Sequence, residues 1–265
     1  MEIKKLKYPE NWIERKNQNQ PISVVTCYDY MMAKWISKTE IDAILVGDSL
    51  GMVFQGNSST LPVTVEQIIY HTKIVRRGAP NIFLIADMPF GSYQSSKKDA
   101  LKNSFQIIKE SECQGLKFEG ADDFTLKVIS QLIRSGIPVM GHIGLTPQSF
   151  MNFGGYKIQG KKEKEKQILL QQAKRLEEVG CFALVLELVS PDLAKEITDQ
   201  VSIPTIGIGS GKDTNGQVLV IYDLLGMDPD FIPKHAKKFA NFSELGIEAL
   251  KKYDLEIKQK SFPKI

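Results

Sequence analysis

Short apolar runs that stop at an ionisable residue recur along the chain, and helical sequence lies between most of them. Five such runs are AILVG before Asp48, IFLIA before Asp87, LKF before Glu119, PVMG before His142 and FALVL before Glu187. Each run is long enough for one buried strand, and strands that alternate with helices indicate a parallel sheet. In a closed parallel barrel the strand ends converge on one mouth, so these five side chains are expected to meet there.

The length of the chain fits such a barrel. A (β/α)8 barrel takes about 250 residues, and the chain has 265. We predict an α/β fold, a single-domain (β/α)8 TIM barrel over residues 1–265 with extra N- and C-terminal helices, rather than two small domains. The expected strands are 22–27, 43–46, 82–86, 116–118, 139–141, 182–186, 205–208 and 218–222. The segment between the last two strands is too short for a full helix, and this argues against eight complete strand–helix repeats.

Composition argues against two classes of partner. The 34 basic and 31 acidic residues are interspersed, the net charge is +3, and no basic stripe is interleaved with aromatics, so no nucleic-acid partner is expected. The longest apolar run, 182–186, is far shorter than the ~20 residues of a membrane span, and the N-terminus has no apolar signal core. Cys27, Cys113 and Cys181 lack metal-ligand spacing, which predicts buried free thiols and a cytoplasmic location.

Three carboxylates at successive strand ends predict a divalent metal site. Asp48, Asp87 and Glu119 are oxygen donors, and carboxylates gathered in one pocket repel one another unless a cation lies between them. Hard oxygen ligands suit Mg²⁺, with Mn²⁺ as a substitute, whereas zinc more often takes His or Cys. The simpler interpretation, in which each Asp caps a helix or turn, is weaker for three successive acids than for one.

Three further residues are candidates for substrate contact or catalysis. Lys117 lies two residues before Glu119, so both face the same side of the sheet; it balances the acids or, as we favour, holds a substrate carboxylate. His142 ends its strand as either a core hydrogen-bonding residue or a site residue. Glu187 follows five apolar residues, and a desolvated carboxylate suits a general base; a structural salt bridge is the alternative.

Two long connections are expected to be binding loops or lids. They are SLGMVFQGNSSTLPV after Asp48 and IGLTPQSFMNFGGYKIQG after His142, and both exceed the usual ~4–6 residues. A glycine-rich run, GIGSGK at 207–212, fits neither the Walker loop nor the GxGxxG pattern. Its glycines are expected to let the backbone come close to a ligand at the barrel mouth.

Several longer motifs resemble those of one known family. They are TCYDY at 26–30, VGDSLGMVFQGNSSTLPVT at 46–64, YHTKIVRRGAP at 70–80, DMPFGSY at 87–93, KFEG at 117–120, GHIGLTPQS at 141–149, GGYKIQG at 154–160, LVLE at 184–187 and PTIGIGSG at 204–211. With them the chain resembles the ketopantoate hydroxymethyltransferases, also called 3-methyl-2-oxobutanoate hydroxymethyltransferases, from about residue 26 to residue 242.

The resemblance implies a Mg²⁺-dependent (β/α)8 barrel of pantothenate biosynthesis. Such an enzyme transfers a hydroxymethyl group from 5,10-methylenetetrahydrofolate to 3-methyl-2-oxobutanoate through a Mg²⁺-bound enolate, giving 2-dehydropantoate. One Mg²⁺ per subunit and a homo-oligomer, commonly a decamer, are implied as well.

The resemblance also implies roles for individual residues. The implied metal ligands are Asp48, Asp87 and Glu119. The implied substrate contacts are Asp48, Ser49, Asp87, Lys117 and His142. Glu187 is implied as the proton acceptor. Two small departures from the family pattern, Ala121 and the Leu-Val-Ser-Pro that follows Glu187, touch none of these roles.

Two other interpretations stay open on the sequence alone. A Mg²⁺-dependent C–C lyase or mutase of the phosphoenolpyruvate mutase/isocitrate lyase type would use similar acids. Such lyases usually present a reactive cysteine in a mouth loop, and no cysteine of this chain is expected directly after a strand end. The second interpretation is a barrel without enzymatic activity that only binds a metal, a ligand or nucleic acid. The desolvated Glu187, which suits a general base, argues against it.

Overall fold

The computed structural model describes residues 5–151, 155 and 157–263 of the chain. These residues form two compact units, the first up to Val218 and the second from Leu219 onward. Each unit is described by itself, and the expected single domain stays a prediction.

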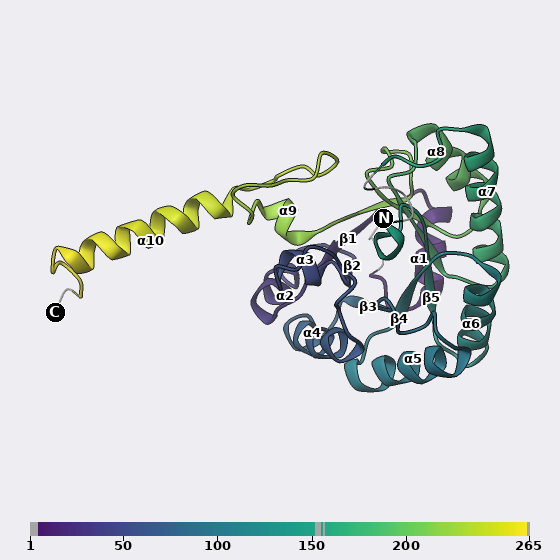
Figure 1. Cartoon of the computed structure of the whole chain (residues 1–265), viewed down its shortest axis with the longest axis horizontal. Helices are drawn as coiled ribbons and strands as arrows, with labels where there is room; N and C mark the ends of the chain where they lie inside the picture. Colours follow the sequence, from purple (N-terminus) through teal and green to yellow (C-terminus); the bar gives the residue numbers. More distant parts are fainter. Residues whose placement is uncertain (1–4, 152–154, 156, 264–265) are drawn as a thin grey trace. The chain divides into compact units, whose positions relative to one another are not determined.

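Eight strands of the first unit close into a parallel barrel in chain order (Figure 1). The strands are β1 Ile22–Thr26, β2 Ala43–Val46, β3 Phe83–Asp87, β4 Gly115–Glu119, β5 Val139–Gly144, β6 Ala183–Glu187, β7 Thr205–Ile208 and β8 Gly216–Leu219. Successive strands pair in parallel from β1 to β8, and the amide of Ile22 closes the ring by donating to the carbonyl of Asn215 (2.9 Å). The predicted (β/α)8 barrel is confirmed.

Helices follow most strands and cover the outside of the barrel (Figure 1). They are α2 Tyr30–Ile36, α3 Leu50–Val53, α4 Val65–Gly78, α5 Lys97–Ser111, α6 Asp123–Arg134, α7 Glu163–Glu178 and α8 Pro191–Gln200. Local side chains mark where the helices start. Thr64 and Gln67 form a capping box at the start of α4, and the side chains of Ser96 and Asp122 accept hydrogen bonds from backbone amides of α5 and α6. The buried residues of α4 recur at helical spacing, which fixes its inner face.

The predicted N-terminal helix is α1, Pro9–Asn17, and it closes the end of the barrel where the strands begin. Trp12 of α1 is fully buried between Phe83 and Phe182, whose ring centroids lie 5.4 Å and 5.3 Å away in edge-to-face geometry. Lys16 of α1 donates to the carbonyl oxygens that follow α8, including that of Val201 (2.6 Å). The core therefore fills one end of the barrel and leaves the strand carboxyl ends for polar groups.

Strand boundaries differ from the expected ones by a few residues. Asp87, Glu119 and Glu187 are the last residues of their strands rather than the first residues after them. His142 was expected to end its strand but lies within β5, which continues to Gly144. The eighth strand, expected at 218–222, is Gly216–Leu219, because the chain turns into α9, Ile221–Leu225, directly afterwards. Residues 209–215 between β7 and β8 form no helix, as their number indicated.

The second unit contains α9 and the predicted C-terminal helix, α10 Phe242–Lys258. Within the described residues α10 has no buried side chain, and its apolar residues Leu245, Leu250, Tyr253 and Leu255 are all more than half exposed. Among the described helices, none combines the length and the apolar character that crossing a membrane requires.

Candidate active site

The strand ends bring the predicted ionisable residues together at one mouth of the barrel. In the strand register Asp87 lies opposite Lys117, and Glu119 lies opposite His142. Asp48 follows β2, and its amide donates to the Asp87 carboxylate (2.9 Å). All five side chains are buried, with at most 7% of each residue exposed. The structure thus brings four of the five strand-end residues together around Lys117, and the fifth, Glu187, joins the group through His142.

Lys117 lies at the centre of the group. Its Nζ is 2.7 Å from Asp87 Oδ1, 3.7 Å from Glu119 Oε1 and 3.3 Å from His142 Nδ1. Burial lowers the pKa of Lys117, but the negative charges of Asp87, Glu119 and Asp48 outweigh burial and raise the pKa above its ordinary value. The ammonium is therefore charged and paired.

His142 connects the acids to Glu187. Its Nδ1 is 3.5 Å from Glu119 Oε1, and its Nε2 is 3.3 Å from Glu187 Oε2, an ion-pair contact without hydrogen-bond geometry. Burial and the charge of Lys117 lower the pKa of His142, but the contacts with Glu119 and Glu187 outweigh them and raise it to about 9. An imidazolium at this position holds both carboxylates in place.

Glu187 is less buried than its apolar neighbours in sequence led us to expect. Its side chain is 13% exposed, more than that of any other ionisable group in the cluster, so a substrate can reach its oxygens. The next residue, Leu188, has a φ of +47°, a left-handed conformation that costs a leucine roughly 1–2 kcal/mol. Strained backbone of this kind gathers at functional positions.

Asp48 and Ser49 form the side of the mouth next to β2. Ser49 Oγ lies 2.8 Å from the hydroxyl of Tyr28, which is fully buried. Burial and the charges of Asp87 and Glu119 raise the pKa of Asp48 well above its usual range, and Lys117 only partly offsets them. Burial also raises the pKa of Asp87, while the cation of Lys117 opposes the rise.

Sequence reasoning missed three residues that hold the site together. Gln148 bonds to Asp48 and Glu119, the hydroxyl of Tyr93 donates to the carbonyl of Glu119 (3.1 Å), and Tyr28 contacts Ser49. All three belong to motifs of the family resemblance, so the motifs were one available signal. The spacing of apolar residues could not indicate these three residues, because polar contacts across the barrel leave no pattern within a short segment of sequence.

The donor set fits a divalent cation. Three carboxylates face one lysine, and Glu119 Oε1 is a buried oxygen without a hydrogen-bond partner. Burial opposes ionisation of Glu119, yet His142 and Lys117 hold its pKa below the usual value, so this oxygen is negatively charged. Among the described residues, no three acids, histidines or cysteines are arranged so that they could hold a metal ion by themselves. Water and substrate oxygens would have to complete the coordination, as is usual for Mg²⁺.

One expectation about the cysteines is wrong, although all three are free and buried as predicted. Cys27 does follow a strand end directly, because β1 stops at Thr26. Burial raises the pKa of this thiol to about 12. A buried, protonated thiol is a poor nucleophile or acid near neutral pH, so the position does not restore the lyase interpretation.

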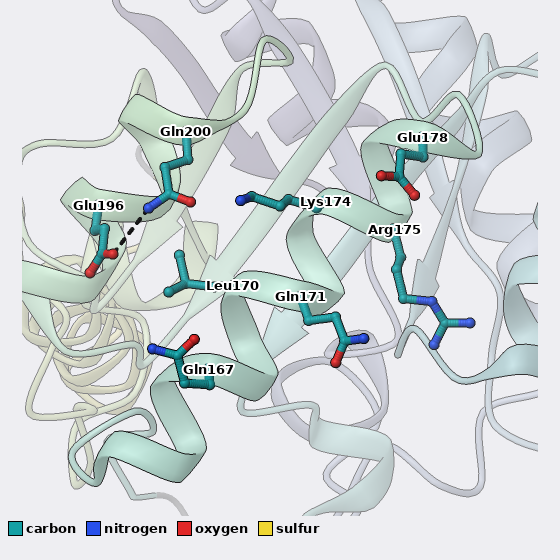
Figure 2. A pocket seen from close by; sticks show the side chains of 8 residues that line it. All are labelled: Gln167, Leu170, Gln171, Lys174, Arg175, Glu178, Glu196 and Gln200. Carbon is teal, nitrogen blue, oxygen red and sulfur yellow. Dashed lines mark hydrogen bonds between the residues drawn. The ribbon is translucent and has the colours of Figure 1, made fainter.

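A groove of about 440 Å³ lies elsewhere, on the outer surface between α7 and α8 (Figure 2). Lys174 and Arg175 of α7 line it together with Glu196 of α8, whose carboxylate accepts from Gln200 (3.0 Å). These polar side chains are on the outside of the barrel and include none of the clustered acids. The groove is therefore no part of the candidate active site.

Comparison with known proteins identifies the family. The family model described as "Ketopantoate hydroxymethyltransferase" matches residues 8–265. The chain belongs to the ketopantoate hydroxymethyltransferase family. The match is longer at both ends than the 26–242 of the sequence resemblance. Family membership confirms the predicted enzyme class, a transferase, and the predicted hydroxymethyl transfer of the pantothenate pathway.

Curated relatives carry the same description. A 3-methyl-2-oxobutanoate hydroxymethyltransferase of Leptospira interrogans serogroup Icterohaemorrhagiae serovar copenhageni is 53% identical over 248 residues, which cover 94% of each chain. One of Pseudothermotoga lettingae is 51% identical over 244 residues, with 92% of each chain covered.

Solved structures of other enzymes share the barrel. A 2,3-dimethylmalate lyase, described as a PEP mutase/isocitrate lyase superfamily member, has a TM-score of 0.60 at 12% identity and covers 98% of this chain and 90% of its own. A phosphonopyruvate hydrolase complex with oxalate and Mg++ has a TM-score of 0.63 at 9% identity, with 97% and 88% covered. At such identities the likeness shows the fold alone, so the lyase or mutase alternative gains only a shared architecture.

Proposed function

We propose that this chain transfers a hydroxymethyl group from 5,10-methylenetetrahydrofolate to 3-methyl-2-oxobutanoate and releases 2-dehydropantoate. The names of the relatives support the substrate and the product. The observation that carries the proposal is the buried cluster in which Lys117 pairs with Asp87 while His142 joins Glu119 to Glu187. The cluster offers a cation for a substrate carboxylate and a reachable base beside it.

We further propose that Asp48, Asp87 and Glu119 hold one Mg²⁺, with Mn²⁺ as a possible substitute. When bound, the ion supplies a Lewis acid that draws electron density from the keto and carboxylate groups of the substrate and so acidifies C3. Two observations support the assignment: Glu119 Oε1 accepts no hydrogen bond, and the raised pKa of Asp48 describes a carboxylate whose charge Lys117 only partly offsets.

The side chains then divide the work of proton transfer and orientation. Lys117 and Ser49 bind the oxo-acid, and Lys117 offsets negative charge as the substrate enters. His142 holds the carboxylate of Glu187 through its Nε2 (3.3 Å). Glu187 accepts the C3 proton, and the electron pair left on C3 forms the new carbon–carbon bond to the one-carbon unit of the folate. Water hydrolyses either the folate adduct or the folate iminium, which supplies the hydroxyl oxygen of the new group and releases tetrahydrofolate.

The test is a product assay on the full chain. Incubation with 3-methyl-2-oxobutanoate, 5,10-methylenetetrahydrofolate and Mg²⁺ should yield 2-dehydropantoate, identified by mass. Asp87→Ala removes the partner of Lys117 and a proposed metal ligand, so it should abolish Mg²⁺-dependent turnover. Absence of product from the unmodified chain, together with cleavage of isocitrate or methylisocitrate, would favour the lyase alternative instead.

The assembly and the location are part of the same proposal. We propose a homo-oligomer, a decamer as the family resemblance implies, with the exposed apolar side chains of α10 as supporting observation. We propose that it works in the cytoplasm, which the three buried free thiols support. Small molecules are its proposed partners, with no nucleic acid and no membrane.

A further inference from the structure

Gln148, in the loop after β5, forms hydrogen bonds with two of the clustered acids. It lies in a single 3₁₀ turn, η1 Pro147–Ser149, and is only 7% exposed. Its Nε2 donates to Asp48 Oδ2 and to the carbonyl oxygen of Met88, both at 2.9 Å. Its backbone amide donates to Glu119 Oε2 (3.1 Å). One residue therefore binds two of the three proposed metal ligands.

The orientation of the Gln148 amide is set by its surroundings. The carbonyl of Met88 can only accept a hydrogen bond, so the NH₂ group must face it, and the same Nε2 donates to Asp48. On the opposite side, Oε1 accepts from Gln94 Nε2 (2.9 Å) and lies 3.2 Å from the hydroxyl of Tyr93. A flipped amide would set its oxygen against the carbonyl oxygen of Met88, so the network allows one orientation.

In two of the acids, one carboxylate oxygen accepts a backbone hydrogen bond and the other has no hydrogen-bond partner. Glu119 Oε2 is held by the Gln148 amide, while Glu119 Oε1 has no hydrogen-bond partner. Asp87 Oδ2 is likewise held by the Asp48 amide, and its Oδ1 has no hydrogen-bond partner but only the ion pair with Lys117. A carboxylate fixed through one oxygen presents the other in a defined direction.

We propose that Gln148 is a positioning residue for the metal ligands, holding Asp48 and Glu119 so that their remaining oxygens face the cation. The inference rests on the proposed Mg²⁺ site and goes beyond it by assigning a partner to the ligands. Partners of this kind, when replaced, typically lower metal affinity or activity by about 10- to 100-fold. Gln148 contacts the proposed metal ligands and takes no part in the proposed proton transfer.

A consequence concerns the loop that carries Gln148. The side-chain amide of Gln148 donates to Asp48, and its backbone amide donates to Glu119. A cation that fixes these two acids therefore also restrains the loop. Mg²⁺ should therefore slow hydrogen exchange of the backbone amides at 145–151. This measurement uses the unmodified chain and does not depend on how any variant folds.

The main experiment measures Mg²⁺ binding by titration calorimetry in the absence of substrates. Gln148→Met keeps the length of the side chain and the backbone amide but loses the bond to Asp48, so its Kd should rise about 10-fold or more. The matched control is Gln159→Met, in the same connection, because the Gln159 side chain donates to the carbonyl of Lys157 and not to the acids. The control should bind like the unmodified chain.

The outcomes separate this inference from the proposed function. If the unmodified chain does not bind Mg²⁺, the proposed metal site is wrong. If it binds and Gln148→Met binds equally well or more tightly, the positioning role is wrong. Thermal unfolding of the metal-free proteins measures the structural contribution separately, because a purely structural role would lower the melting temperature of Gln148→Met and leave the Kd of the folded protein unchanged. Should Gln148→Met fail to fold, unchanged exchange at 145–151 on adding Mg²⁺ to the unmodified chain would overturn the inference.

Discussion

Glu187 is distinguished from the other ionisable residues of the mouth by its exposure. Asp48, Asp87, Lys117 and Glu119 are enclosed by one another, whereas the Glu187 side chain keeps 13% of its surface open and touches only His142 among the other predicted site residues. A base must reach the C3 proton, and Glu187 is the most accessible carboxylate of the group. This contrast supports the proposed role of Glu187 as the proton acceptor.

The first prediction concerns this proton transfer. Glu187→Gln keeps the shape of the side chain but removes its basicity, so it should bind 3-methyl-2-oxobutanoate and slow exchange of the C3 proton by at least ~100-fold. Exchange with solvent deuterium, followed by NMR in the presence of Mg²⁺ and without folate, measures the step directly. Exchange at the unmodified rate would remove Glu187 from the role of base.

The second prediction concerns pH and metal binding. Burial, together with the charges of Asp87 and Glu119, raises the pKa of Asp48 in the metal-free protein, so this carboxyl holds its proton to higher pH than a free aspartate. A cation must displace that proton, and Mg²⁺ affinity should therefore rise with pH until Asp48 is ionised. Calorimetry in buffers of different ionisation enthalpy should detect proton release on binding. Asp48→Asn, which has no such proton, should abolish the release; an affinity independent of pH would contradict the assignment.

At the scale of elements, α1 closes the barrel end opposite the acids. Trp12 contacts Phe83 at the start of β3 and Phe182 just before β6, so its helix packs against the beginnings of the strands. The site lies at the other ends of the same strands. Stability and chemistry are therefore separated along the barrel axis, as is usual for this fold.

The third prediction uses this separation. Trp12→Ala leaves a cavity among Phe83 and Phe182 and should lower the free energy of unfolding by about 3–5 kcal/mol. Trp12→Phe is the matched variant: it keeps an aromatic ring and removes Nε1, a buried donor without a hydrogen-bond partner, so it should lose clearly less. Urea unfolding followed by circular dichroism gives both values. Equal losses in the two variants would show that ring packing is not what α1 contributes.

At the scale of the whole molecule, the C-terminal helix α10 stands out by its exposed apolar side chains. Leu245, Leu250, Tyr253 and Leu255 of α10 are exposed within the described residues, and α10 buries none of its side chains. Apolar surface of this extent marks an interaction site on soluble proteins. In a homo-oligomer, contact between subunits would cover it.

The fourth prediction tests this interpretation. Removal of residues 242–265 should lower the number of subunits per assembly, obtained by light scattering after size exclusion as native mass divided by chain mass, because the apolar surface of α10 is lost. Leu250→Ser should lower the subunit number as well, whereas Lys252→Ser, a change of an exposed charged residue of the same helix, should leave it unchanged. A truncated chain with the subunit number of the full chain would place the subunit contacts elsewhere.

Much of the site could be predicted because the barrel converts sequence position into spatial position. An apolar run followed by an acid becomes a strand with its carboxyl end at the mouth, whichever strand it is, so Asp48, Asp87, Glu119, His142 and Glu187 were found without any knowledge of contacts. The errors were local: the strands end at Asp87, Glu119 and Glu187 and not before them, since backbone pairing continues for as long as neighbouring strands allow.

The sequence by itself determined the strand–helix alternation, the barrel and the set of residues at its mouth, because these follow from periodicity and capping within short segments. Only the tertiary structure decided how the residues pair: Lys117 with Asp87, His142 with Glu187, and Gln148 with Asp48 across 100 positions of the chain. Such pairings depend on strand register, loop path and side-chain rotamer together. Those quantities are settled by the packing of the whole barrel, and no segment of sequence contains them alone.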